Sequence, residues 1–169
     1  MSSLSLALLG LCAALLVFGA VHDIIARTIP DAVPAGIALA ALVLNILAGD
    51  LFWSFVAALS VMCVSLLIYW LRLMGGGDAK LFAAIGFLLP PAEVLPGIAA
   101  IAIAGGVLAL LFLALRPGLR ARQIAPAGRS APLHRRALAA ELWRIRRGGP
   151  LPSAVAISAG ALFTMISSG

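Results

Sequence analysis

Apolar residues run along this chain in long blocks that short polar connections separate. The pattern predicts helices rather than strands, because the longest blocks reach the ~20 residues that an α-helix needs to cross roughly 30 Å of hydrocarbon. The first block should end at His22 and Asp23. The fold expected is an all-α integral membrane protein with six transmembrane helices. They are predicted over residues 4–21, 32–48, 51–73, 80–90, 93–115 and 153–167.

The block at residues 80–90 is the shortest of the six, and charge decides whether it crosses. As a helix, its about 11 residues would measure only roughly 17 Å. Nine of the 12 basic residues lie between Arg116 and Arg147, and the positive-inside rule assigns such a stretch to the cytoplasm. If residues 80–90 did not cross, the next segment would carry these arginines outward. We therefore expect a short crossing helix, both termini outside and every Lys and Arg on the cytoplasmic side.

Residues 116–150 are too polar to cross a membrane and are predicted to form a basic cytoplasmic loop. Within them, Leu138, Leu142 and Ile145 recur at helical spacing among arginines. This pattern predicts an amphipathic helix over residues 133–147 that lies on anionic lipid headgroups. The alternative for these arginines is a docking role for other proteins. The whole chain, residues 1–169, is expected to form one membrane-embedded domain.

Composition supports a membrane protein and excludes several other classes. The chain is 63% hydrophobic and 11% charged, whereas soluble domains are roughly 45 to 50% apolar and 25% charged. The net charge of +6 is concentrated in one loop, so it indicates topology, and no nucleic-acid partner is expected. Cys12 and Cys63 lie in apolar blocks and are too few for a disulfide framework or a cysteine metal site. No metal or cofactor is predicted, and the oligomeric state stays open.

The amino terminus is expected to remain as a membrane helix. It opens an apolar run without the basic region of a secretory signal, and no convincing small-residue cleavage site follows. Residues 4–21 are therefore assigned to the first crossing segment.

Two aspartates are the candidate chemical groups. Asp78 follows three consecutive glycines, residues 75–77, where we expect the preceding helix to stop because glycine is a poor helix former. The predicted topology puts Asp23, at the end of the first segment, at the same cytoplasmic level. Two carboxylates a few Å apart cannot both ionise cheaply, so they share a proton. Such a pair can activate a water as base and protonate a carbonyl as acid.

Each of these residues also has an ordinary structural role. Asp78 can cap the fourth helix, and Asp23 can be an interfacial residue. His22 is explained better as a residue of the membrane interface than as a catalytic base. Lys80 is expected either to pair with one of the two carboxylates or to extend to lipid headgroups. Asp31 is predicted to cap the second helix, and the alternative role of the glycines is close packing alone.

The stretch around Asp78 resembles a known signature. Gly75-x-Gly77-Asp78, with Lys80 two residues later, looks like the motif of the GxGD intramembrane aspartyl proteases. A single GxGD sequence would be weak support by itself.

The earlier aspartate also resembles a family motif. Asp23, followed by Arg27, Ile29-Pro30 and Asp31, is similar to the first-aspartate motif of the prepilin peptidases, the type IV leader peptidases, which has an aspartate ahead of a basic residue and Ile-Pro-Asn. Residues 152–161 look like the closing helix of that family, which usually opens Pro-Tyr-Gly. The resemblance covers nearly the whole chain and is specific because both aspartate motifs occur in the right order.

The resemblance implies a bacterial inner-membrane aspartic endopeptidase for pilus assembly. It would cleave the basic leader from prepilin or pseudopilin precursors at the cytoplasmic face, after a glycine and before the hydrophobic helix. Its small size looks most like the Tad or Flp pilus branch, so proteolysis alone is expected, without zinc and without the methyltransferase activity of larger relatives. The implied roles are catalytic for Asp23 and Asp78, supporting for Gly75, Gly77 and Lys80, and leader or headgroup contact for Arg27, Pro30 and Asp31.

Two departures from the family pattern put the substrate range in doubt. Asp31 stands where the family usually has Asn, and Ser153-Ala154 stands where it often has Tyr-Gly. We expect neither departure to touch the aspartate pair.

Two other functions compete with the peptidase. One is a proton-coupled transporter or channel subunit in which Asp23 and Asp78 relay protons. The other is a catalytically silent assembly protein of the pilus machinery. The position of both aspartates near one face favours hydrolysis over transport. A proton relay would need further acidic residues across the outer half of the membrane, and this topology leaves none there.

Overall fold

All regular secondary structure is helical in the computed structural model, which describes residues 2–120, 139, 142–143 and 151–167. These residues form six α-helices and one short 3₁₀ helix, η1. In chain order the elements are α1 (Ser3–Ala26), α2 (Ala32–Ala48), α3 (Leu51–Trp70), α4 (Gly76–Leu88), η1 (Pro91–Glu93), α5 (Val94–Arg120) and α7 (Ser153–Ser167).

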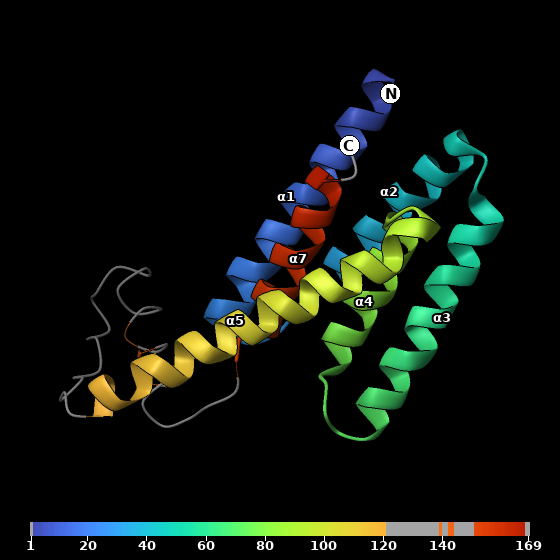
Figure 1. The fold of residues 1–169 in the computed structure, drawn as a ribbon. Coiled ribbons are helices and arrows are strands. Elements are labelled where there is room, and N and C mark those ends of the chain that lie inside the picture. Colours follow the sequence, from blue (N-terminus) through green and yellow to red (C-terminus); the bar gives the residue numbers. More distant parts are fainter. Residues whose placement is uncertain (1, 121–138, 140–141, 144–150, 168–169) are drawn as a thin grey trace.

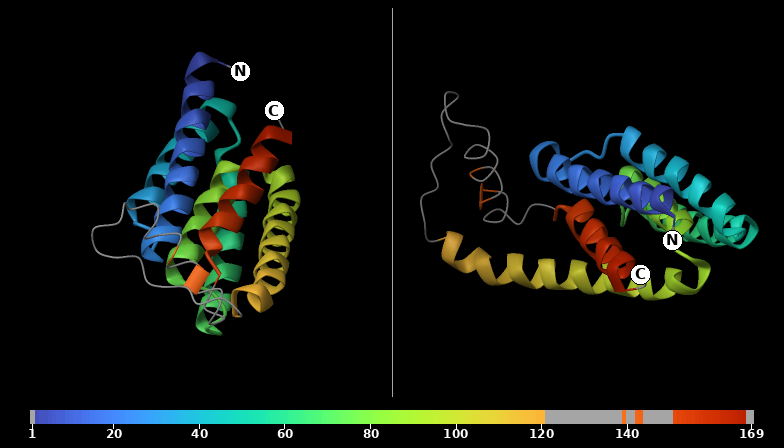
Figure 2. Two further views of the ribbon diagram at one scale, coloured as in Figure 1. Left: turned by 90° about the vertical axis from the view of Figure 1, so that its left-hand side faces the viewer. Right: turned by 90° about the horizontal axis from the view of Figure 1, so that it is seen from above.

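Helix α4 is the centre of the bundle. It packs against α2, α3 and α7, while α1 lies between α2 and α7 (Figure 1). Helix α5 packs mainly on α7, and its carboxy-terminal part continues past the other helices (Figures 1 and 2). The first and last described helices are therefore neighbours, although more than a hundred residues separate them in the sequence.

The sides of the bundle are apolar, as a lipid-facing surface requires. Phe52, Leu95 and Ile166 have 70%, 78% and 81% of their surface exposed. Helices α1 and α3, together with a third helical stretch from Pro91 to Pro117, are long and apolar enough to cross a membrane, and α2 and α7 are shorter apolar helices. These features confirm the prediction of an all-helical membrane protein.

Four of the six helices (α1, α3, α4 and α5) differ from the predicted segments, whereas α2 and α7 match them. Helix α1 continues past His22 and Asp23 to Ala26. It ends where Arg27 takes a left-handed conformation, φ 56°, and its backbone N–H donates to the Asp23 carbonyl at 2.9 Å. Asp23 therefore lies in the last helical turn rather than at the end of the helix.

The glycine stretch does not act as the helix break that was predicted. Helix α3 ends earlier, at Trp70, because Arg72 adopts φ 61°. Helix α4 begins at Gly76, so Gly76 and Gly77 form its first turn. A Cβ on Gly77 would lie 3.3 Å from the Cβ of Ile29, so close packing, the alternative interpretation, explains this glycine.

The predicted amphipathic helix over residues 133–147 falls almost entirely outside the described residues. Helix α5 reaches Arg120, five residues beyond the predicted end of its segment. The proposed headgroup contact of the basic loop therefore stays a prediction.

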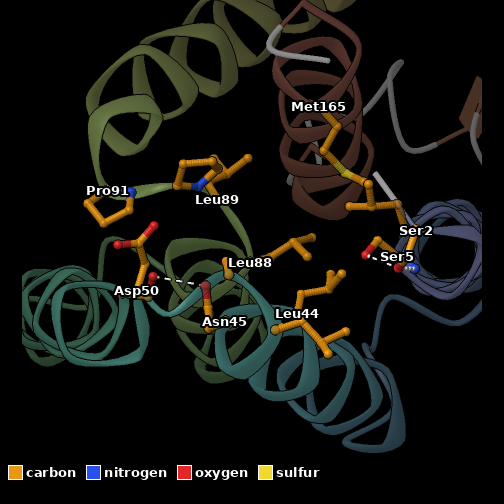
Figure 3. Close-up of a pocket in the computed structure, with 14 residues that line it drawn as sticks. Ser2, Ser5, Leu44, Asn45, Asp50, Leu88, Leu89, Pro91 and Met165 are labelled. Carbon is orange, nitrogen blue, oxygen red and sulfur yellow. Dashed lines mark hydrogen bonds between the residues drawn. The ribbon is translucent and has the colours of Figure 1, made fainter.

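The two ends of the bundle differ in chemistry. At one end, a cavity of about 600 Å³ is lined by the amino-terminal Ser2, by Asp50 and Pro91 from two connections, and by Met165 near the carboxy terminus (Figure 3). Asp23 and Asp78 lie at the other end. The amino-terminal end of α1 and the carboxy-terminal end of α7 therefore lie opposite the aspartates (Figure 1).

A buried amide ties three helices together beneath that cavity. The Asn45 side chain donates to the Phe87 carbonyl at 2.8 Å and accepts from Ser54 Oγ at 2.9 Å. Asn45 and Ser54 are 7% and 0% exposed. Because both ends of the amide are satisfied, the one strongly polar residue of α2 is a structural link between α2, α3 and α4.

Close packing of α7 on α5 depends on Gly160, which gives a test of the fold. A Cβ at this position would overlap the backbone of Ile101. We expect Gly160→Ala to lower the free energy of unfolding by about 1 to 3 kcal/mol, since the helices must separate. Thermal unfolding in detergent, followed by circular dichroism, measures this.

The matched control is Gly10→Ala in α1, where a Cβ would meet nothing within 4 Å. This change should leave the stability unchanged or raise it by up to about 1 kcal/mol through helix propensity. Equal melting temperatures for the two variants would contradict the packing described for α5 and α7.

Candidate active site

The fold brings Asp23 and Asp78 to the same end of the bundle. Asp23 projects from the last turn of α1 and is 6% exposed, and Asp78 lies in the first turn of α4 and is half-buried. The two side chains interact electrostatically. The sequence-based expectation that these two residues meet is thus consistent with the geometry.

The start of α7 holds both carboxylates. Ser153 Oγ donates to Asp78 Oδ2 at 2.7 Å, and the backbone N–H of Ala154 donates to Asp23 Oδ2 at 3.1 Å. Because the two donors belong to consecutive residues, covalent geometry keeps the two Oδ2 atoms within about 10 Å of each other. The free N–H groups of a helix amino terminus favour such negatively charged partners.

The expectation that Ser153-Ala154 stays away from the aspartates is therefore wrong. These residues begin α7 directly after Pro152, and they contact one carboxylate each. One signal for this was present in the sequence. The predicted topology already put the start of the last segment at the cytoplasmic level of Asp23 and Asp78, and a helix amino terminus there supplies donors.

Asp78 combines a local structural role with its place in the site. Its carboxyl lies next to Gly75, the N-cap residue of α4. A Cβ on Gly75 would lie 3.2 Å from Asp78 Oδ2. The absence of a side chain at Gly75 thus leaves room for the carboxylate. Gly75, and not Asp78 as the alternative predicted, is the N-cap residue of α4.

Lys80 does not pair with the two candidate catalytic carboxylates. Its Nζ lies 2.7 Å from Asp31 Oδ1, and both side chains are largely exposed, at 57% and 78%. Asp31 is the N-cap residue of α2, as predicted, but its side chain makes no capping hydrogen bond. The pair joins the start of α4 to the connection between α1 and α2.

The residues between α1 and α2 support that connection. His22 Nδ1 donates to the Thr28 carbonyl at 2.7 Å, which gives the ring a local partner. The Pro30 carbonyl accepts from the Val33 N–H at 2.9 Å, where α2 begins. Arg27 terminates α1 by its left-handed conformation. These hydrogen bonds show that His22, Arg27 and Pro30 shape the connection next to Asp23.

A cavity of about 570 Å³ opens beside Asp78. The loop after α3 and helices α4, α5 and α7 line it, with Asp78, Ser153 and Arg72 as its polar side chains. The remaining side-chain wall is apolar and includes Phe82 and Leu108. The cavity can therefore receive an apolar peptide segment next to a carboxylate.

Comparison with known families decides the class of protein. The model of the type IV leader peptidase family matches residues 10–112, which is more than half of the chain and contains both aspartates. The chain belongs to this family. No curated protein and no solved structure matches it.

Membership identifies the chemistry, because type IV leader peptidases are aspartic prepilin peptidases. The resemblance found in the sequence is thereby confirmed at the level of the family, the enzyme class and its prepilin substrates. The matched region ends before α7. The contacts of Ser153 and Ala154 with the aspartates are therefore a result of the structure alone.

The arrangement of this leader peptidase can support hydrolysis by two carboxylates. One carboxylate is nearly buried and the other half-buried, and each accepts a hydrogen bond from α7. Among the described residues, no three His, Cys, Asp or Glu side chains come together in a way that could hold a metal ion.

Lys80 gives a test that separates the site from its surroundings. Because its ammonium pairs with exposed Asp31, we expect Lys80→Gln to lower kcat/KM for a prepilin by less than about fivefold, since exposed ion pairs contribute only about 0 to 1 kcal/mol. Cleavage of a purified precursor measures this. Asp31→Asn should have an effect of the same size, and a hundredfold loss in Lys80→Gln alone would place the lysine in the catalytic machinery.

Proposed function

We propose that this leader peptidase uses Asp23 and Asp78 as its catalytic pair. The observation that carries the proposal is the convergence of one carboxylate from α1 and one from α4 on adjacent donors of α7, next to a cavity of about 570 Å³. The substrates are the leader peptides of prepilin or pseudopilin precursors. Gly75 and Gly77 support the pair by letting α4 start close to its neighbours.

The reaction follows from two acids that share one proton. The ionised carboxylate takes a proton from a water whose oxygen attacks the carbonyl carbon of the scissile peptide, while the protonated carboxyl gives its proton to the carbonyl oxygen. The resulting gem-diol then collapses and the C–N bond breaks. The leaving nitrogen receives the proton taken from water, and the other carboxylate recovers its proton from a hydroxyl group.

We further propose that the aspartates face the cytoplasm of a bacterial inner membrane. Arg27 and Arg72 lie in the connections at their end of the bundle and Lys80 lies near the start of α4, whereas the connections at the opposite end contain Asp50 and Glu93. The positive-inside rule then assigns the aspartate end to the cytoplasm and both termini to the outside.

The proposal also includes six crossings in one peptidase domain, residues 1–169. Helix α4 has only 13 residues, roughly 20 Å, so it crosses only if Asp78 lies below the headgroup level. The basic loop, residues 116–150, would then contact anionic lipid headgroups.

A narrower proposal rests on the resemblance alone. It assigns the enzyme to the Tad or Flp pilus branch and expects cleavage without methylation of the new amino terminus. Cleavage of a Flp-type precursor in preference to a longer prepilin would support this assignment. Mass spectrometry of the product would show an unmodified amino terminus.

The main test of the proposed function concerns the two aspartates. We expect Asp23→Asn and Asp78→Asn each to lower cleavage of a pilin-like precursor at its leader junction by at least about a thousandfold, because an amide can neither take nor give the proton. The assay uses purified protein in detergent or lipid and follows the shortened product by gel or mass spectrometry.

Folding controls make this result specific. Asparagine has nearly the same volume as aspartate, so both variants should retain a cooperative melting transition. Cleavage at the normal rate in either folded variant would overturn the catalytic pair. A folded wild-type protein that cleaves no pilin-like precursor would overturn the proposed function and favour the transport alternative, which proton flux into proteoliposomes measures.

A further prediction concerns the cavity beside Asp78. Gly105 lines it, and a Cβ there would meet only Ala156 at 3.7 Å. Gly105→Leu should therefore fill part of the cavity and lower kcat/KM for a precursor by about tenfold or more, equivalent to about 1.4 kcal/mol.

The neighbouring residue is the matched control. Gly106 is exposed and does not line the cavity, and a Cβ added to it would meet nothing within 4 Å. Gly106→Leu should change kcat/KM by less than about twofold. Equal losses in the two variants would show that the precursor does not use this cavity.

A further inference from the structure

The first two residues of α7 act on the aspartates through different kinds of donor. Ala154 contributes a backbone N–H, which can only donate, so Asp23 Oδ2 must be the acceptor. Ser153 contributes a hydroxyl group, which donates to Asp78 Oδ2. A hydrogen bond given to an ionised carboxylate stabilises the oxygen that accepts it. The two Oδ2 atoms are thus held as acceptors by adjacent residues of α7.

Helix α7 is itself fixed in position by contacts outside the aspartate pair. One turn after Ala154, Ser158 Oγ donates to the Leu16 carbonyl of α1 at 2.9 Å, and Ser158 is 2% exposed. On another part of the helix, Gly160 lies directly against Ile101 of α5. Because α7 is attached to α1 and α5, its first turn has little freedom to move relative to Asp23.

We infer that Ser153 is a positioning residue for Asp78, and that the first turn of α7 sets the resting geometry of the aspartate pair. This inference rests on the proposed function, because it assumes that the pair is catalytic. It goes beyond the family assignment, since Ser153 lies outside the residues that the family model matches. In this chain a serine takes a position where the resembling motif often has tyrosine, and its short side chain reaches the carboxylate directly.

Ser153 acts on catalysis without touching the reacting atoms in this scheme. Its hydroxyl holds Oδ2 of a half-buried carboxylate and so restrains the rotamer of Asp78. Loss of the hydroxyl should therefore slow the chemical step and leave precursor binding unchanged. A merely structural role would instead change stability or KM.

The test compares Ser153→Ala, Ser153→Thr and Ser158→Ala in the full chain, with a pilin-like precursor as substrate. We expect Ser153→Ala to lower kcat by about tenfold or more, as for loss of a hydrogen bond to a charged group, with KM changed by less than about twofold. Ser153→Thr keeps the hydroxyl and should restore kcat to within about threefold of the wild-type value.

Ser158→Ala is the control, because it removes a buried hydroxyl from the same helix without contact to either aspartate. It should lower the melting temperature and leave kcat within about twofold of wild type. Equal kcat losses in Ser153→Ala and Ser158→Ala would overturn the positioning role.

The outcomes distinguish this inference from the proposed function. Cleavage that needs both aspartates but is indifferent to Ser153→Ala would overturn the positioning role alone. Cleavage that persists in folded Asp23→Asn or Asp78→Asn would overturn the catalytic pair and the positioning role together. A large kcat loss in Ser153→Ala that Ser153→Thr fails to restore would also contradict the role of the hydroxyl.

Discussion

The structure depends on satisfying a carboxylate that is almost completely removed from water. Asp23 is 6% exposed within an apolar bundle, and an unpaired buried charge would be costly. The backbone N–H of Ala154 supplies its hydrogen bond, and the amino terminus of α7 adds a favourable dipole. This requirement links the last described helix to the first one and thereby explains why α7 lies beside α1. Once α7 is there, Ser153 reaches Asp78 as well.

Much of the fold follows from the sequence because apolar blocks have clear polar boundaries. The limits of α2 and α7 agree with the prediction, since Asp31 and Gly49 enclose the former and Pro152 precedes the latter. The boundaries around Arg27 and Arg72 could not be predicted. Both residues adopt a left-handed conformation that nothing in an arginine side chain favours.

The aspartate pair was predictable and its surroundings were not. Topology and motif order pointed to Asp23 and Asp78, because charged residues in apolar chains are few. The donor to Asp23 is a backbone N–H, which any residue but proline carries, so the residue type at position 154 could not predict this hydrogen bond. The partner of Lys80 was missed for another reason. Asp31 is 49 positions earlier in the sequence, and only the packing of α4 against the α1–α2 connection brings the two together.

The order of the donors along the chain has a consequence for how the enzyme is made. Both aspartates lie in the first half of the sequence, whereas the donors that hold them begin at Ser153. Synthesis proceeds from the amino terminus, so a nascent chain that has not yet reached α7 carries the two carboxylates without their hydrogen bonds. The site is therefore assembled last, when the final helix joins the bundle, and a truncated product has the acidic groups of a protease without their arrangement.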